Sequence, residues 1–170
     1  MPEMEQLASR WLARFEQALH EPGEAALRAL FREDSHWRDV LALTWSIRTL
    51  SGAGAHLPEL RRLAALARAG NFRIDTARTA PRMVKRAGSA ALEAIFRFET
   101  ATGPGNGVLR LDPEGGKAWT LLTALEAIKG REEHVGKARP KGESYSRDFR
   151  GPNWLDQRRA AQRYEGRDPT

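Results

Sequence analysis

The residues best suited to chemistry lie between Trp37 and Leu50, where charged side chains stand among large aromatic ones. Asp39 alternates in step with Trp37 and Trp45, so a strand here would place a carboxylate on an apolar face. Burying a carboxylate is costly unless it is paired or hydrogen-bonded. Asp39 could therefore be a pocket acid or base, with Arg48 orienting an anionic group, or the two could form a structural ion pair between helix and sheet.

Two later segments add polar side chains that could contact a ligand. Glu99 ends an alternating run and would lie at the mouth of a curved sheet, or on a solvated, cross-strand paired face. Thr123 is the small polar member of a row that begins at Trp119, and it could bind a ligand or satisfy itself locally. Trp37, Trp45 and Trp119 could together form the aromatic wall of a cavity, although core packing alone also explains them.

Several common catalytic and metal-binding patterns are absent from the sequence. It has no cysteine, which excludes disulfides, thiolate metal sites and a cysteine nucleophile. No two of its 4 histidines have the spacing of a helical metal site, so no metal is expected. There is no phosphate-binding loop and no nucleophile elbow. Gly103, Gly105 and Gly107 predict a permissive hairpin between two strands.

Composition and charge narrow the class of partner. The net charge is +6 and the pI about 10.3, but basic and acidic side chains are interspersed. Counterion release needs a concentrated basic stripe, so nucleic acid is not an expected partner. No uncharged run approaches the roughly 18 residues of a membrane-spanning helix, and the acidic N-terminus does not resemble a signal peptide. We therefore expect a cytoplasmic protein that does not bind a membrane.

The spacing of apolar residues predicts the elements that must position these side chains. Stripes at intervals of three and four predict helices over 4–19, 26–30 and 57–67, with a turn at 33–35. Alternation predicts strands over 36–45, 72–76, around 84, 92–100, 108–111 and 118–127. The later strands follow one another without helices between them. This order predicts an α+β fold, with helices on one face of a curved antiparallel sheet.

The composition changes after Gly130, where glycine, proline and charged residues become frequent. We therefore predict a domain over residues 1–130 and an extended arm over residues 131–170. Asn153 as an N-cap, with Asp156 three residues later, predicts one short helix within the arm.

Several of these stretches carry a resemblance to a known group of proteins: residues 37–39, 43–45, 48–49, 96–100, 118–125, 129–133, 139–140 and 153–159. Together they resemble the N-terminal region of bacterial and fungal flavin-containing monooxygenases. The resemblance extends over most of the chain, from about residue 11 to residue 169. It implies a nuclear-transport-factor-like (SnoaL-like) cone, an α+β barrel in which three helices pack against a strongly bent antiparallel sheet with a cavity.

The resemblance also implies an accessory role. The arm would lead into a flavoprotein domain, absent from this chain, that uses FAD and NADPH to oxygenate a small organic molecule. No residue that binds flavin or nicotinamide can be carried over, because the glycine-rich dinucleotide loop is missing here. The unit would then shape substrate access, pack on the flavoprotein domain or form a homodimer, with no cofactor of its own.

A second interpretation is a stand-alone enzyme acting on a small organic molecule. Folds of this type host isomerases, cyclases and epoxide hydrolases, so the fold alone cannot decide between the two interpretations. Asp39 would be the acid or base and Arg48 would orient it, while Thr123 and Glu99 would contact the ligand. The sequence alone does not decide whether this chain is itself an enzyme.

Overall fold

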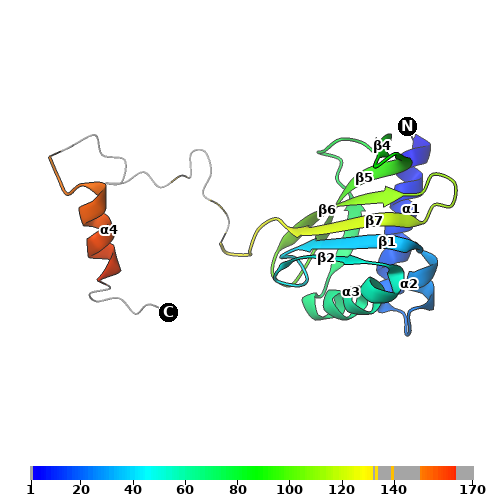
Figure 1. Cartoon of the computed structure of the whole chain (residues 1–170), viewed down its shortest axis with the longest axis horizontal. Coiled ribbons are helices and arrows are strands. Elements are labelled where there is room, and N and C mark those ends of the chain that lie inside the picture. The colour runs from blue at the N-terminus through cyan, green and yellow to red at the C-terminus, as the bar shows by residue number, and fades with distance from the viewer. Residues whose placement is uncertain (1, 132, 134–138, 140–149, 164–170) are drawn as a thin grey trace. The chain divides into compact units, whose positions relative to one another are not determined.

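The computed structural model describes residues 2–131, 133, 139 and 150–163 (Figure 1). The chain divides into two compact units, Met1–Glu132 and Glu133–Thr170. The first unit contains α1 (Pro2–His20), α2 (Ala25–Ala29), β1 (Phe31–Val40), β2 (Ile47–Ser51), α3 (Ala53–Ala67), β3 (Gly70–Ile74), β4 (Arg82–Arg86), β5 (Ser89–Glu99), β6 (Pro104–Leu111) and β7 (Ala118–Leu125). Among the helices that the structure describes, none has the length and apolar character needed to cross a membrane.

The second unit contains α4 (Trp154–Gln162), which begins as the sequence predicts. The Asn153 side chain accepts the Asp156 N–H, and the Asp156 carboxylate accepts the Asn153 N–H, which makes a complete capping box. The predicted short helix is confirmed.

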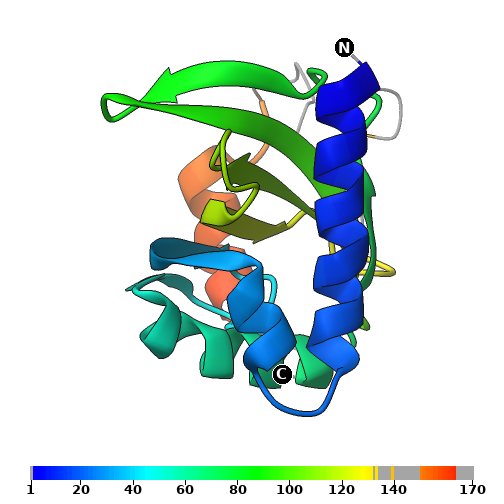
Figure 2. The same ribbon diagram turned by 90° about the vertical axis from the view of Figure 1, so that its right-hand side faces the viewer.

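Helix α1 lies across one face of the sheet (Figure 2). Its buried stripe has the predicted spacing of three and four and consists of Ala8, Trp11, Leu12, Phe15, Ala18 and Leu19. The Glu16 carboxylate accepts the backbone N–H groups of Asn71 and Phe72 at 2.8 and 3.0 Å. These bonds attach α1 to the edge strand β3, and the rings of Phe15 and Phe72 meet edge-on beneath them.

The sheet is mixed, with the strand order β2-β1-β7-β6-β5-β3, and β4 pairs with the other half of β5. Every pair is antiparallel except β1–β7, which is parallel. The predicted α+β class, with three helices packed against a curved sheet, is confirmed. The expectation of a wholly antiparallel sheet is wrong at this one pair. A parallel pair needs a long crossover connection, and here most of the unit lies between the two strands.

Strand β1 differs from its predicted course at both ends. The turn predicted at 33–35 is wrong, because Glu33 and Asp34 lie within the strand with exposed side chains. Their carboxylates form ion pairs with Arg28 and Arg32, so residue types typical of turns are held on a strand surface. The strand ends at Val40 instead of continuing to residue 45, and the sequence did not predict the β2 strand that follows the loop.

The glycine-rich segment before residue 108 also differs from prediction. Residues 104–107 belong to β6 and do not form a hairpin loop. A Cβ at Gly105 would overlap the Phe98 ring, and one at Gly107 would overlap the Phe96 ring and the Leu122 carbonyl. The glycines therefore allow two buried phenyl rings to lie against the backbone of the next strand.

Candidate functional site

One row of residues crosses the inner face of the sheet and contains two of the predicted site residues. In the strand register Asp39 lies opposite Thr123, Thr123 opposite Gly107, and Gly107 opposite Phe96. Cross-strand partners project on the same side of a sheet. The register thus brings Asp39 and Thr123 together, as the sequence predicts, and places the Phe96 ring beside them over the backbone of Gly107.

The Asp39 carboxylate is 1% exposed, and both of its oxygens accept hydrogen bonds. Oδ2 accepts the Thr44 N–H at 2.8 Å, the Thr44 hydroxyl at 2.7 Å and the Leu43 N–H at 3.1 Å. Oδ1 accepts the Thr123 hydroxyl at 2.6 Å. Such bonds offset the cost of burying a carboxylate. Asp39 therefore holds the loop that follows β1 from inside the unit.

Trp37 is joined to this carboxylate through Thr123. The indole Nε1–H donates to Thr123 Oγ1 at 3.0 Å, and that hydroxyl donates onward to Asp39. All three side chains are buried. The arrangement leaves none of the three polar groups without a partner, and it fixes the ring and the hydroxyl in single orientations.

Arg48 does not orient Asp39, although the two residues lie opposite each other on β1 and β2. Its guanidinium forms an ion pair with Glu59 of α3 at 3.5 Å. No hydrogen bond or ion pair between Arg48 and Asp39 occurs among the described residues. Arg48 therefore neither orients Asp39 nor forms the structural ion pair that was the alternative. The loop N–H groups of Leu43 and Thr44 take the place of the expected arginine.

The three tryptophans do not assemble into one wall. Trp37 is buried, Trp119 is half-buried and Trp45 is 60% exposed. No ring contact joins any two of them in the part of the chain that the structure describes. The predicted alternation fails at Trp45 because β1 ends at Val40, and the loop then turns this side chain away from the core.

The loop of residues 41–46 has an unusual backbone. Leu41 and Trp45 adopt positive φ angles of 63° and 54°, a left-handed conformation that bulky residues rarely take. The Leu41 N–H donates to the Ser46 carbonyl and closes the loop. Together with the bonds to Asp39, this closure compensates the conformational cost of the two residues.

Glu99 lies on the opposite face of the sheet from Phe96 and Phe98, so it is not in the hollow of the cone. Its carboxylate accepts the Asn71 side-chain amide at 3.0 Å and lies 3.6 Å from the Arg73 guanidinium. It lines a shallow surface pocket of about 460 Å³ with neighbours that include Lys129. Of the two places that the sequence allowed for Glu99, the structure shows the solvated, cross-strand paired face and not the mouth of the curved sheet.

A buried histidine and serine form a pair that the sequence analysis missed. Ser35 Oγ and His56 Nε2 share a 2.8 Å hydrogen bond, and both residues are fully buried. Burial, together with the nearby charges of His36 and Arg28, lowers the pKa of His56 from 6.5 to about 4. His56 Nδ1 has no hydrogen-bond partner among the described residues. Only a fold that pairs β1 with α3 brings these two residues together, so no local pattern could have revealed them.

The outer face of the sheet carries a cluster of opposite charges around Glu93. Burial alone would raise the pKa of its carboxyl, but ion pairs with Arg110, Arg86 and Arg82 keep that pKa below its usual value. Within the described ranges, no three His, Asp or Glu side chains form a group that could hold a metal ion. The ion pairs of Glu93 instead connect β5 to the neighbouring strands β4 and β6.

Comparisons with known proteins concern the fold. No family model and no curated protein matches the chain. Among solved structures, a steroid delta-isomerase from Pseudomonas aeruginosa is similar at 16% identity, over 74% of this chain and 84% of that one, with a TM-score of 0.45. PrhC from Penicillium brasilianum is similar at 17% identity, over 74% and 81%, with a TM-score of 0.44. A protein named as a SnoaL-like polyketide cyclase, from Shewanella denitrificans, is similar at 16% identity, over 74% and 92%, with a TM-score of 0.41.

None of these three is named as a flavin monooxygenase. At such identities and TM-scores, the activities in their names do not extend to this chain. Its function has to be argued from its own side chains.

Proposed function

We propose that the first unit is a protein-binding accessory domain whose contact surface is the tip of the β1–β2 hairpin. This hairpin tip comprises residues 41–47. The observation that carries the proposal is the exposure of three large apolar side chains within it: Leu41 is 42% exposed, Trp45 60% and Ile47 64%. Large exposed apolar patches on soluble domains commonly mark interaction sites.

The backbone of the hairpin tip supports this proposal. Holding Leu41 and Trp45 in the left-handed region costs roughly 1–2 kcal/mol for each residue. The buried Asp39 carboxylate offsets that cost from the inside. A backbone conformation that lowers the stability of the fold while it exposes a tryptophan is typical of a binding site. Tryptophan is enriched among the residues that dominate interface energies.

The position of the hairpin tip favours a partner on the C-terminal side of the unit. Because β1 and β7 are parallel, with Val40 opposite Ala124, both strands end at the same edge of the sheet. The chain continues from β7 at this edge, where the Lys129 N–H and ammonium bind the carbonyls of Thr102 and Thr100. Ile128, the residue before Lys129, adds another exposed apolar side chain.

The partner we propose is the flavoprotein part of a flavin-dependent monooxygenase. The resemblance at residues 37–39, 43–45 and 48–49 supports this choice, since these stretches contain Trp45 of the hairpin tip together with Asp39 and Thr44, whose hydrogen bonds hold it. The partner would bind FAD and NADPH and oxygenate a small organic molecule. No residue of this chain is assigned to either cofactor, and its contribution would be to pack on the partner beside the substrate entrance.

Titration of the chain into an FAD-loaded flavoprotein of that group, followed by calorimetry, tests the proposal. We expect saturable binding that Trp45→Ala weakens by about tenfold or more, as for a central interface tryptophan. Leu66→Ala is the matched control, because Leu66 is a 69% exposed apolar residue on α3. Absence of binding, or equal weakening by the two variants, would overturn the proposal. So would self-association of the chain that Trp45→Ala abolishes.

A second candidate function, a stand-alone isomerase or cyclase, is favoured by one specific observation. The buried Trp37–Thr123–Asp39 chain of hydrogen bonds ends in a carboxylate that could exchange a proton with a ligand if the loop opened. This function requires that Asp39→Asn abolish turnover of a small ketone substrate while the folded protein persists. Turnover retained by folded Asp39→Asn protein would exclude it.

A further inference from the structure

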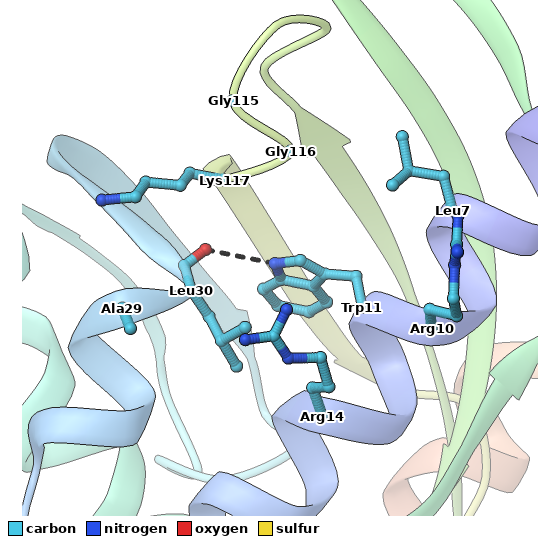
Figure 3. A pocket seen from close by; sticks show the side chains of 9 residues that line it. All are labelled: Leu7, Arg10, Trp11, Arg14, Ala29, Leu30, Gly115, Gly116 and Lys117. Carbon is cyan, nitrogen blue, oxygen red and sulfur yellow. Dashed lines mark hydrogen bonds between the residues drawn. The ribbon is translucent and has the colours of Figure 1, made fainter.

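A small cationic pocket lies at the other end of the sheet, between α1, the end of α2 and the β6–β7 turn (Figure 3). Its volume is about 280 Å³. Arg10 and Arg14 of α1 line one side, and Lys117 of the turn lines the other. None of the residues that line it is acidic.

The three cationic side chains of this pocket have no hydrogen-bond or ion-pair partner among the described residues. Most other arginines of the unit do, as Arg97 does with Asp75 and Arg110 with Glu93. Arg10 and Arg14 are four residues apart on one helix, a spacing at which like charges repel. All three side chains are exposed, so water solvates their charges in the free protein, and a bound anion would reduce the repulsion between the two arginines.

The apolar side of the pocket is rigid. The Trp11 indole N–H donates to the Leu30 carbonyl at 3.1 Å, and both residues are buried at the pocket wall (Figure 3). Trp11 also stacks on Phe15 at a centroid distance of 5.0 Å. The pocket thus combines a fixed apolar wall with exposed, unpaired cationic side chains.

We propose that this pocket binds a small phosphate ester whose organic part is short and apolar. Three positive charges match a phosphate dianion better than a singly charged carboxylate. Guanidinium groups bind phosphate oxygens through two parallel hydrogen bonds, and the lysine ammonium adds a point charge. The organic part would contact the exposed edge of Leu7 and the wall formed by Trp11 and Leu30.

This site is independent of the hairpin tip. Phe31 lies opposite Ala118 at the pocket end of the β1–β7 pair, whereas Val40 lies opposite Ala124 at the other end. A ligand in the pocket would therefore bind with or without a protein partner at the tip, and the two proposals can fail separately.

Titration of the full chain with phenyl phosphate, followed by NMR of the tryptophan indole N–H signals, tests the proposal. We expect saturable shifts of the Trp11 signal that weaken with added salt, since the attraction is ionic. Arg14→Gln and Lys117→Gln should each weaken binding by about tenfold, the loss expected for one charge-assisted hydrogen bond. Lys85→Gln removes the same charge from β4, outside the pocket, and should leave the affinity unchanged.

Two further probes separate the chemistry. Inorganic phosphate should bind more weakly than phenyl phosphate, and benzoate more weakly still. No saturable binding of phenyl phosphate, equal weakening by Lys85→Gln, or benzoate binding as tight as that of phenyl phosphate would each overturn the proposal.

Discussion

The Thr123 hydroxyl donates a 2.6 Å hydrogen bond to the Asp39 carboxylate, although 84 residues of chain separate the two. The bond joins the first strand of the sheet to the last. It also connects the hairpin tip, which Asp39 holds through Thr44, to the interior of the unit.

Thr123→Val should destabilise the unit by about 2–4 kcal/mol. The valine has nearly the same shape, but it leaves the Trp37 indole N–H without a partner, and Asp39 Oδ1 keeps only the longer 3.3 Å bond from the Leu43 N–H. A buried donor without a partner costs about 1–3 kcal/mol, and a hydrogen bond to a charged group contributes about 1.5–3 kcal/mol. Urea denaturation followed by tryptophan fluorescence measures the change. Thr120→Val is the matched control on the same strand, because the buried Thr120 hydroxyl has no partner to lose. It should be neutral or slightly stabilising, and equal destabilisation by both valines would contradict this account.

Asp39→Asn should loosen the hairpin tip and lower stability by about 2–3 kcal/mol. An amide presents N–H groups toward the N–H donors of Leu43 and Thr44, so at least one buried bond is lost. Hydrogen exchange of the amides at residues 43 and 44 should accelerate in this variant. Asp34→Asn is a suitable comparison, since Asp34 is an exposed partner of Arg32 on the same strand and should change stability by less than about 1 kcal/mol. Unchanged exchange at residues 43 and 44 would refute the anchoring role.

Gly107→Ala should be strongly destabilising, by about 3 kcal/mol or more, because the new methyl group would overlap both a buried ring and a carbonyl oxygen of the next strand. Gly54→Ala provides the contrast. Gly54 lies in the first turn of α3, and its Cβ would meet nothing closer than 4.0 Å, so alanine should be neutral or stabilising by up to about 1 kcal/mol. Thermal unfolding of the two variants decides the matter. Tolerance of alanine at 107 would contradict the described packing of Phe96.

Acid should destabilise the unit through His56. Its pKa is about 4 in the folded protein and 6.5 ordinarily, so between these values the unfolded chain binds more protons than the folded one. Stability therefore rises with pH through this window and falls on acidification, by about 2 kcal/mol between about pH 7 and pH 5. Urea denaturation at both pH values measures the difference. His56→Gln should abolish most of it, and an unchanged pH dependence in that variant would show that other groups are responsible.

The helices and most strands could be predicted from the sequence because their apolar spacing is local. The stripe of α1 and the alternation of β5 hold over many residues and match the structure. The capping box of α4 is equally local, since Asn153 and Asp156 are only three residues apart.

The sequence predictions that were wrong share one cause: they concern residues whose contacts are with residues far away in the sequence. Gly105 and Gly107 look like loop residues until Phe98 and Phe96 are placed against them. The structure joins Asp39 to Thr123 by a hydrogen bond, but the partner expected for Asp39 was Arg48, and backbone N–H groups of a loop cannot be recognised from side-chain types in the sequence. The Ser35–His56 pair has no local pattern at all, because β1 and α3 become neighbours only through folding.

The parallel pairing of β1 with β7 has a consequence for folding during synthesis on the ribosome. During synthesis, the first strand leaves the ribosome early but must wait for the last one, whose final residue is Leu125, before its inner edge is covered. Until then Trp37 and Asp39 lack Thr123, the residue of β7 to which both are hydrogen-bonded. Contacts between such distant segments form slowly. Until β7 emerges, the nascent chain therefore exposes an unpaired strand edge, which other chains can pair with.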